Sequence, residues 1–376
     1  MDEIPVPSVK VDQQSLTPRM DGRRRRRRTI RCVGAARVEN LSPSTAPTDD
    51  PVAPSLVPAV AAMWLVVAVF AAITALWSHH VDVPLRDPGG KMFLRKLLGA
   101  VLLFAGLAVV DVAIRWWRAG RTRGAALDVV RRRLAPVRLA LVLAALVAYH
   151  LIYLCYRNLK SWDVLQTPHD AWMLRFDRDL FAGHSPAVLL HHLLGEDVAA
   201  HPLAFVYKIF TYVCTVAIVG SLAFLDDIRR AHVMLVAGMW TWILGTVSYY
   251  LIPTLGPVFS APQEFTGLPH TAVTTMVVDD IRDRDLFLAD PQNPHAFVGV
   301  SAFASLHVGF TTTVLLMAVY LRKRVLACLL AAYLVAVMVA TVYFGWHFIL
   351  DLVGGVVIAV LAVALGHLTV YRRLRR

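Results

Sequence analysis

Eight long stretches of apolar side chains constrain this chain more than any other feature of its sequence. A helix needs roughly 20 apolar residues to span the hydrocarbon core of a membrane. The chain has 376 residues and is 57% hydrophobic, with a mean hydropathy of +0.57, which is too apolar for a soluble protein of this length. We therefore expect an all-α, polytopic membrane helical bundle of about eight spans, at 55–78, 94–117, 134–156, 202–224, 231–252, 300–321, 325–346 and 349–371.

The basic residues between these stretches indicate their orientation. Lys and Arg accumulate in cytoplasmic loops, and here they occur at every second connection, at 23–28, 115–133, 229–230, 322–324 and 372–376. We therefore expect an integral membrane protein with both termini in the cytoplasm, and the Arg-rich composition favours a bacterial plasma membrane. The long loops 157–201 and 253–299 then face outward, as do the polar residues at the outer ends of the last spans.

Composition divides the chain into four parts. Residues 1–54 lack apolar periodicity, so we expect a disordered, basic cytoplasmic tail. Two extra N-terminal spans and an Arg-rich cytoplasmic loop would occupy 55–133, a six-span core 134–371, and a second basic tail 372–376. The arginines at 23–28 could bind nucleic acid or anionic lipid, but a basic block before a first span is more typical of an orientation signal. We expect no nucleic-acid partner.

Ionisable side chains at the ends of the last spans indicate chemistry. His347 and Asp351 are one helical turn apart, and His307 begins an earlier span; such groups are costly beside hydrocarbon. Each pattern alone occurs by chance, but their combination on one predicted outer face favours a site. One imidazole can attack phosphorus, the carboxylate can orient it, and the second imidazole can protonate the leaving oxygen. The pattern predicts phosphoryl transfer at an extracytoplasmic site without a metal or other cofactor.

A phosphate in such a site needs positive charge and hydrogen-bond donors around its oxygens. Ser305 is close to the predicted start of a span, where unpaired main-chain N–H groups can bind an anion. Arg157, Lys160 and Lys208 are the candidate cations. We therefore predict that these four residues bind phosphate.

Other polar residues of the outer loops have simpler interpretations. The segment from Asp170 to Phe181, followed by Gly183 and Pro186, predicts a short interfacial helix and a turn. The pairs His79-His80 and His191-His192 could suggest metal ligands, but adjacent histidines point to different sides of a helix. We expect these histidines to be interfacial and predict no metal site.

Two motifs resemble those of a known family. The run Ala304-Ser305-Leu306-His307 is similar to the Pro-Ser-Xxx-His motif of the type 2 phosphatidic acid phosphatase superfamily, and the segment from Gly345 to Gly355 is similar to its histidine-aspartate motif. The segment from Tyr250 to Pro257 resembles the branch of inositol phosphorylceramide synthase and its bacterial relatives. The likeness covers roughly 145–365. It implies a six-helix phosphatase-type core and the following roles: His347 as the nucleophile that forms a phosphohistidine, Asp351 as its orienting partner, His307 as the general acid, and Tyr250, Gly256 and Pro257 near the substrate.

The chain also departs from the pattern of that superfamily. A first motif, with Lys seven residues before Arg-Pro, is absent. Ala340-Thr341 replaces an expected Ser-Arg pair, and Ala304 replaces the motif proline. The cations that normally hold the phosphate must therefore come from elsewhere, and Arg157, Lys160 and Lys208 are the candidates for this function.

Two classes of function fit these observations. The first is a metal-independent membrane phosphatase or inositolphosphotransferase-like enzyme, which moves a phosphoryl or phospho-headgroup unit from a phospholipid or polyprenyl phosphate to water or an alcohol. The second is a non-catalytic protein that binds or transports a lipid or polyprenyl phosphate on the same fold. A transporter would be expected to have paired broken helices or an internal repeat, and neither is evident in this sequence. The pairing of His347 with Asp351 favours the enzyme.

Overall fold

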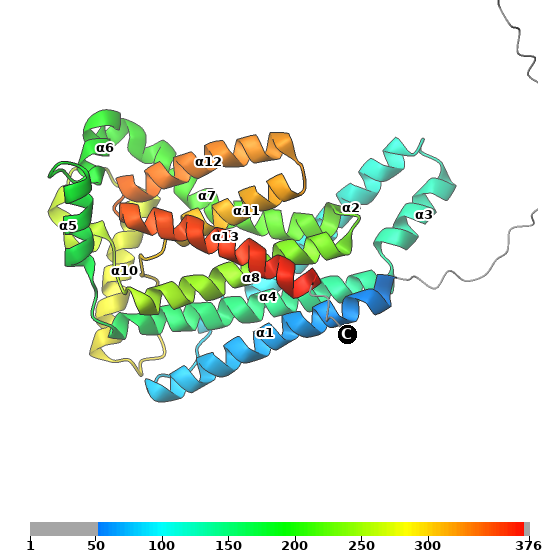
Figure 1. Cartoon of the computed structure of the whole chain (residues 1–376), viewed down its shortest axis with the longest axis horizontal. Helices are drawn as coiled ribbons and strands as arrows, with labels where there is room; N and C mark the ends of the chain where they lie inside the picture. The colour runs from blue at the N-terminus through cyan, green and yellow to red at the C-terminus, as the bar shows by residue number, and fades with distance from the viewer. Residues whose placement is uncertain (1–51, 372–376) are drawn as a thin grey trace, which may run out of the picture. The chain divides into compact units, whose positions relative to one another are not determined.

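The computed structural model describes residues 52–371, which form thirteen α-helices and three short 3₁₀ turns and contain no β-strand. This confirms the predicted all-α class (Figure 1). The predicted basic tails lie outside the described residues, except that the first helix already begins at Val52. The helices are α1 (Val52–His80), α2 (Leu94–Arg118), α3 (Arg123–Arg133), α4 (Pro136–Trp162), α5 (Asp170–Leu180), α6 (Pro186–Leu194), α7 (Glu196–Phe224), α8 (Ile228–Leu251), α9 (Pro257–Ser260), α10 (Ala272–Ala289), α11 (Leu306–Tyr320), α12 (Arg324–Tyr343) and α13 (Ile349–Tyr371).

Seven of these helices are long and apolar enough to cross a membrane: α1, α2, α4, α7, α8, α12 and α13. The chain is therefore an integral membrane protein. The remaining apolar helix, α11, has 15 residues, or about 22 Å at a rise of 1.5 Å per residue, which is less than a hydrocarbon core of about 30 Å. The predicted span at 300–321 was therefore too long, and residues 52–371 contain seven full-length candidate spans and one shorter apolar helix, α11.

Tertiary hydrogen bonds explain why α11 begins later than predicted. The main-chain N–H groups of Ala302 and Phe303 donate to the carbonyl and the hydroxyl of Thr254, at 2.8 Å and 2.9 Å. The N–H of Ala304 donates to the hydroxyl of Ser248 at 2.9 Å. Non-helical backbone is tolerated inside a membrane protein where other protein groups satisfy it. The apolar segment before α11 is therefore an extended strap held by the end of α8 and the loop that follows it.

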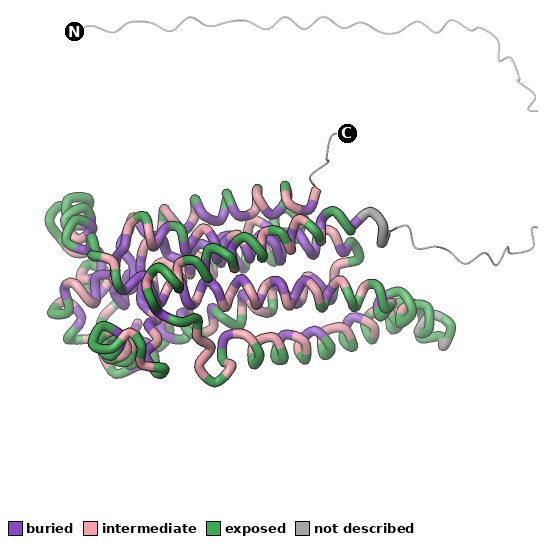
Figure 2. The backbone as a smooth tube through the Cα atoms, turned by 90° about the horizontal axis from the view of Figure 1, so that it is seen from below, coloured by how far each residue is buried: buried purple, intermediate pink, exposed green. Residues whose placement is uncertain are grey.

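Helix α8 lies at the centre of the bundle formed by residues 52–371. In its most apolar window 83% of the residues are buried, compared with 22% to 44% in the other six long helices. Helices α4, α11 and α13 pack against α8, α1 packs on α4, and α2 packs on α7. Figure 2 shows buried residues along the inner faces of the helices and exposed residues at both ends. The two N-terminal helices thus belong to the same compact unit as the rest of the bundle.

The two ends of the bundle have different loops. Helices α5, α6 and α10, which come from the long loops 157–201 and 253–299, lie at one end, and α3 lies at the other (Figure 1). Helix α5 confirms the predicted short helix after Asp170. At the opposite end, Arg133 forms a buried ion pair with Asp111 at 2.6 Å and donates to the carbonyl of Ala223 at the end of α7. The Arg-rich loop and the two long loops, which loop charge predicts on opposite sides of the membrane, therefore lie at opposite ends of the structure.

The histidines set aside as interfacial differ in their surroundings. His79, His80 and His192 are exposed, but His191 is buried. The Nε2 atom of His191 is 2.8 Å from the main-chain carbonyl of Tyr343, in the last turn of α12. The prediction of an interfacial position was therefore wrong for His191, whose ring joins α6 to α12.

Candidate active site

A sharp turn between α12 and α13 positions His347. Gly345 has a φ of +66°, a conformation that favours glycine and commonly ends helices. A Cβ atom at Gly345 would also collide with the ring of Phe265. The next helix begins at Ile349, whose main-chain N–H donates to both oxygens of the Asp177 carboxylate at 3.2 Å. His347 is thus held between a glycine cap and a carboxylate cap from α5.

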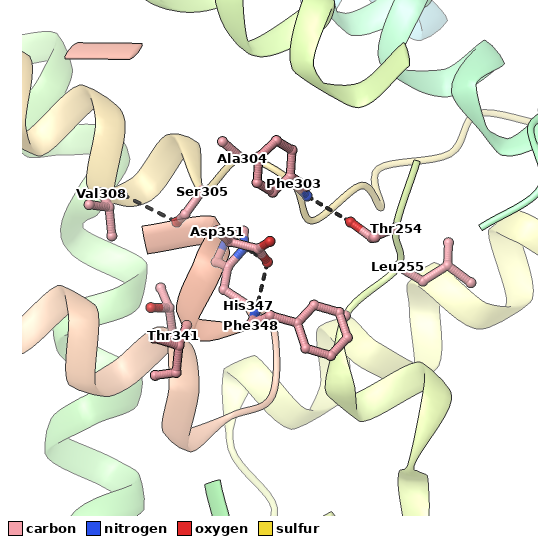
Figure 3. Close-up of polar contacts among 12 residues, drawn as sticks. Thr254, Leu255, Phe303, Ala304, Ser305, Val308, Thr341, His347, Phe348 and Asp351 are labelled. Carbon is pink, nitrogen blue, oxygen red and sulfur yellow. Dashed lines mark hydrogen bonds and ion pairs between the residues drawn. The ribbon is translucent and has the colours of Figure 1, made fainter. Parts of the chain in front are cut away.

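Asp351 lies in the first turn of α13 and faces the imidazole of His347 (Figure 3). Its Oδ2 atom is 3.3 Å from Nδ1 of His347 and accepts the main-chain N–H of Phe348 at 2.8 Å. The first distance is long for a hydrogen bond, but catalytic contacts often shorten when substrate binds. In the tautomer with its proton on Nδ1, the ring of His347 donates to Asp351, and Nε2 then carries the lone pair.

His307 approaches the same place from α11. Its ring packs between those of Tyr207 and Phe210, with centroid distances of 4.3 Å and 4.4 Å. The ring centroids of His307 and His347 are 5.9 Å apart. Within residues 52–371 the ring of His307 makes no side-chain hydrogen bond, and it borders the main cavity of the protein. Two histidines separated by 40 positions in the sequence therefore face one space.

Close packing of α11 against α13 brings the two motifs together. The main-chain N–H of Ser305 donates to the carbonyl of Asp351 at 3.0 Å. A Cβ atom on Gly355 would be 2.5 Å from the carbonyl oxygen of Ser305, and one on Gly309 would be 3.2 Å from the carbonyl oxygen of Gly355. Glycine at these two positions therefore permits the close packing of α11 on α13.

Both histidines border a cavity of about 550 Å³ whose wall also carries Arg157 and Lys160 on α4 and Lys96 on α2. The guanidinium of Arg157 lies 5.3 Å from the ring centroid of Phe297, and the Nζ of Lys160 lies 5.1 Å from that of Tyr249. Both are half-buried, and aromatic faces contribute modestly to holding such cations. The cavity thus offers two positive charges beside the histidines, as an anion requires.

Helix α10 adds a carboxylate to this wall. Burial raises the pKa of Asp280, and the positive charges of Lys160 and Arg157 oppose that rise. Among residues 52–371, no group of three or more His, Cys, Asp or Glu side chains is arranged to hold a metal ion. The polar end of the cavity is therefore built from imidazoles, cations and single carboxylates.

The pKa of His347 is far from its usual value. Burial, and secondly the positive charge of Lys160, lower it from 6.5 to about 3, while the carbonyl of Ala302 acts in the opposite direction. At neutral pH the imidazole is therefore uncharged, and this is the form that can act as a nucleophile.

Comparison with protein families identifies the relatives of this site. A family model described as the PAP2 superfamily matches residues 171–365, slightly more than half of the chain, and this segment includes His307, His347 and Asp351. The chain belongs to the PAP2 superfamily. Comparisons with curated proteins and with solved structures gave no significant match. The match begins after α4, so the cavity cations Arg157 and Lys160 lie outside the segment that carries the PAP2 likeness.

Two further residues predicted to bind phosphate do not line the cavity of this PAP2 protein. Ser305 is fully buried, and its hydroxyl accepts the N–H of Val308 at 3.4 Å, which caps α11 (Figure 3). Lys208 is exposed, and its Nζ is 3.4 Å from the sulfur of Met276 on α10. The structure thus brings Arg157 and Lys160 to the histidines, whereas Ser305 acts as a helix cap and Lys208 contacts α10.

None of the three residues expected near the substrate lines the main cavity. The hydroxyl of Tyr250 donates to the carbonyl of Leu159 at 2.7 Å. Gly256 has a φ of +113°, its N–H donates to Asp170 at 2.8 Å, and a Cβ there would be 2.7 Å from the carbonyl oxygen of Trp346. Pro257 borders a separate void of only about 10 Å³, which His347 also contacts.

Several cavity residues of the PAP2 site were not found from the sequence. On α4, Tyr153 and Tyr156 follow helical spacing and share one face of the helix with the predicted cation Lys160, so this pattern could have indicated a lined cavity. Ser301 gave no such signal. Its hydroxyl donates to the carboxylate of Asp163 at 2.9 Å, and both residues are buried.

Proposed function

We propose that this PAP2 superfamily protein is a membrane phosphotransferase or phosphatase that acts on a lipid-linked phosphoester through a phosphohistidine on His347. One observation carries the proposal: the rings of His307 and His347 border one cavity, 5.9 Å apart. A nitrogen of one ring can attack phosphorus from about 3 Å, and a nitrogen of the other ring can give a proton to the leaving oxygen over about 3 Å. Two rings at this separation can therefore act on one phosphorus centre.

In the first step, Nε2 of His347 attacks phosphorus and forms a P–N bond while the P–O bond to the leaving group breaks. The negative charge of the bound phosphate group favours the protonated form of His307, which gives its proton to the departing oxygen. Asp351 stabilises the positive charge that develops on the His347 ring, because its carboxylate lies against Nδ1 at 3.3 Å. Its role is orientation and charge compensation, as in other histidine–carboxylate pairs.

In the second step, the acceptor oxygen attacks phosphorus and the P–N bond breaks, which restores His347. His307 takes the proton of the acceptor and is ready for the next cycle. Water as acceptor gives hydrolysis, and an alcohol gives transfer. The positive charges of Arg157 and Lys160 stabilise the phosphoryl oxygens in both steps.

A phospholipid or a polyprenyl phosphate is the proposed donor. The apolar spans support a substrate that partitions into the bilayer. The likeness of Tyr250, Gly256 and Pro257 to the inositol phosphorylceramide synthase branch favours inositol or another polyol as the acceptor. The alternation of basic loops supports an extracytoplasmic site with both termini in the cytoplasm.

Turnover by the purified full-length protein tests this proposal. Three probes cover the possible donors: phosphate release from phosphatidic acid, phosphate release from a polyprenyl phosphate, and headgroup exchange between phosphatidylinositol and free inositol. His347→Ala should abolish turnover of whichever probe the wild type accepts. His201→Ala is a matched control, because His201 is exposed in the first turns of α7 and does not line the cavity.

The outcomes separate an enzyme from a carrier. Loss of turnover in His347→Ala together with normal turnover in His201→Ala supports the enzyme. Equal turnover in the wild type and His347→Ala would remove His347 from the chemistry. Retained binding of the lipid phosphate without turnover in any of the three assays would favour the non-catalytic alternative.

A further inference from the structure

The cavity extends well beyond the histidines. On α7, Tyr207 lies beside His307, whereas Val216 borders the cavity nine positions further along the helix, which is roughly 14 Å at 1.5 Å per residue. On α4, Lys160 and Tyr149 border the same cavity and are separated by about 16 Å along the helix by the same measure. The cavity is therefore elongated along the bundle, with Lys160 and the two histidines toward one end.

Helix α2 provides another part of the cavity wall. Gly99, Ala100 and Leu103 border the cavity together with Lys96, at helical spacings that place them on one face. The amine of Lys96 lies 5.1 Å from the ring centroid of Tyr153, so an aromatic face of α4 receives its charge. The rest of this α2 surface is apolar or has no side chain.

Helix α2 is not part of the PAP2 match, which begins at residue 171. It packs on α7 and α4, the two helices that also carry Tyr207, Arg157 and Lys160. A segment outside the family likeness therefore completes the cavity, and apart from Lys96 it does so with apolar groups. Apolar walls gain free energy by burying hydrocarbon, and a volume of about 550 Å³ lies within the range of roughly 300–1,000 Å³ that encloses small molecules.

We propose that α2 is the wall that selects the hydrocarbon chain of the substrate. Gly99 keeps open the part of the cavity beside α2, which we call the arm. The phosphate lies at the histidines, and the first carbons of an acyl or prenyl chain lie between α2, α4 and α7. The inference rests on the proposed function, because a soluble phosphoester would have no use for this arm.

Gly99 provides a specific test. A Cβ built on Gly99 meets no atom within 4 Å, and the same is true of Gly106 on the same helix. Only Gly99 of the two borders the cavity. Gly99→Trp therefore fills the arm, and Gly106→Trp is a matched control with the same substitution, the same helix and comparable open space.

The assay compares two probes on the full-length protein: long-chain phosphatidic acid in mixed micelles and a short, water-soluble phosphoester. Gly99→Trp should lower kcat/KM for the long-chain probe by about tenfold, as expected when about two methylene groups lose their burial, mainly through KM. Its turnover of the short probe should stay within about twofold of wild type, which also shows that the variant is folded. Gly106→Trp should resemble the wild type with both probes.

A second variant covers the case in which Gly99→Trp does not fold. Leu103→Ala widens the same arm and should shift the preference toward bulkier, branched chains. Unchanged chain preference in Leu103→Ala, or equal handling of both probes by Gly99→Trp and wild type, would overturn the role of α2. Failure of the wild type to turn over either probe would instead count against the proposed function, so the two failures are distinguishable.

Discussion

Replacing Gly355 with alanine tests whether the packing of α11 on α13 sets the geometry of the two histidines. The added Cβ would lie 2.5 Å from the carbonyl oxygen of Ser305, whereas ordinary contact begins at 3.4 Å. Relief of this overlap requires the helices to separate by about 0.9 Å, the difference between the two distances. Because Ser305 is two residues before His307 and Asp351 is one turn before Gly355, this separation acts directly on the site.

The expected effects on stability and rate differ in size. Alanine in a helix gains up to about 1 kcal/mol over glycine, while overpacking costs about 1–3 kcal/mol, so the net loss in the free energy of unfolding should be about 0–2 kcal/mol. A misplacement of about 1 Å can reduce a rate on the order of 100-fold. We therefore expect Gly355→Ala to fold and to lose about 10-fold to 100-fold in kcat.

Gly366 in the same helix supplies the control. A Cβ there would be 2.8 Å from the main-chain nitrogen of Ala237, a similar overlap about 16 Å further along α13. Thermal unfolding of both variants, together with turnover of the donor that the wild type accepts, makes the comparison. Turnover by Gly355→Ala equal to that by Gly366→Ala would refute the argument that this crossing positions the histidines.

Four further outcomes are expected. Asp351→Asn should lower kcat by about 10⁴-fold without unfolding the protein, and unchanged turnover would remove Asp351 from the site. With a phosphodiester donor, kcat/KM should not fall as the pH is lowered through 6.5, because burial lowers the pKa of His347 to about 3. A fall at pH 6–7 that titration of the donor does not explain would contradict this. Burial raises the pKa of Asp177 to about 6, against the N–H of Ile349, whereas the unfolded value is about 3.9. The folded state therefore binds more protons between these values, so the free energy of unfolding should fall as pH rises from about 4 to 6, and Asp177→Asn should flatten that fall in thermal unfolding measured across this range. EDTA should leave turnover unchanged, and strong inhibition would show that a metal takes part.

Hydropathy and charge predicted most of the fold because membrane spans depend on composition more than on tertiary contacts. The bounds of α2 and α13 lie within a residue or two of those expected from apolar length. The start of α11 could not be predicted in this way. Residues 300–304 are mostly apolar, and their backbone is non-helical because Thr254 and Ser248, distant in sequence, satisfy it.

The candidate site was predictable to the extent that it follows local spacing. His347 and Asp351 are four residues apart, and this spacing brings their side chains together although His347 precedes the first residue of α13. Gly345 is a recognisable helix end. The meeting of His307 with His347 followed from loop charges that put both at the same end of the bundle. The wall formed by Gly99 was not predictable, because an apolar face that borders a cavity and one that borders lipid have the same composition.

Trapping the phosphoenzyme shows whether His347 carries the phosphoryl group during turnover. The full-length wild type is quenched in base during turnover of a phosphate-labelled donor, and its peptides are analysed by mass spectrometry, with His347→Ala and His201→Ala in parallel. We expect a base-stable, acid-labile phosphate on His347 in the wild type and in His201→Ala. Steady turnover with the phosphate on another residue, or with a labelled intermediate that persists in His347→Ala, would contradict it.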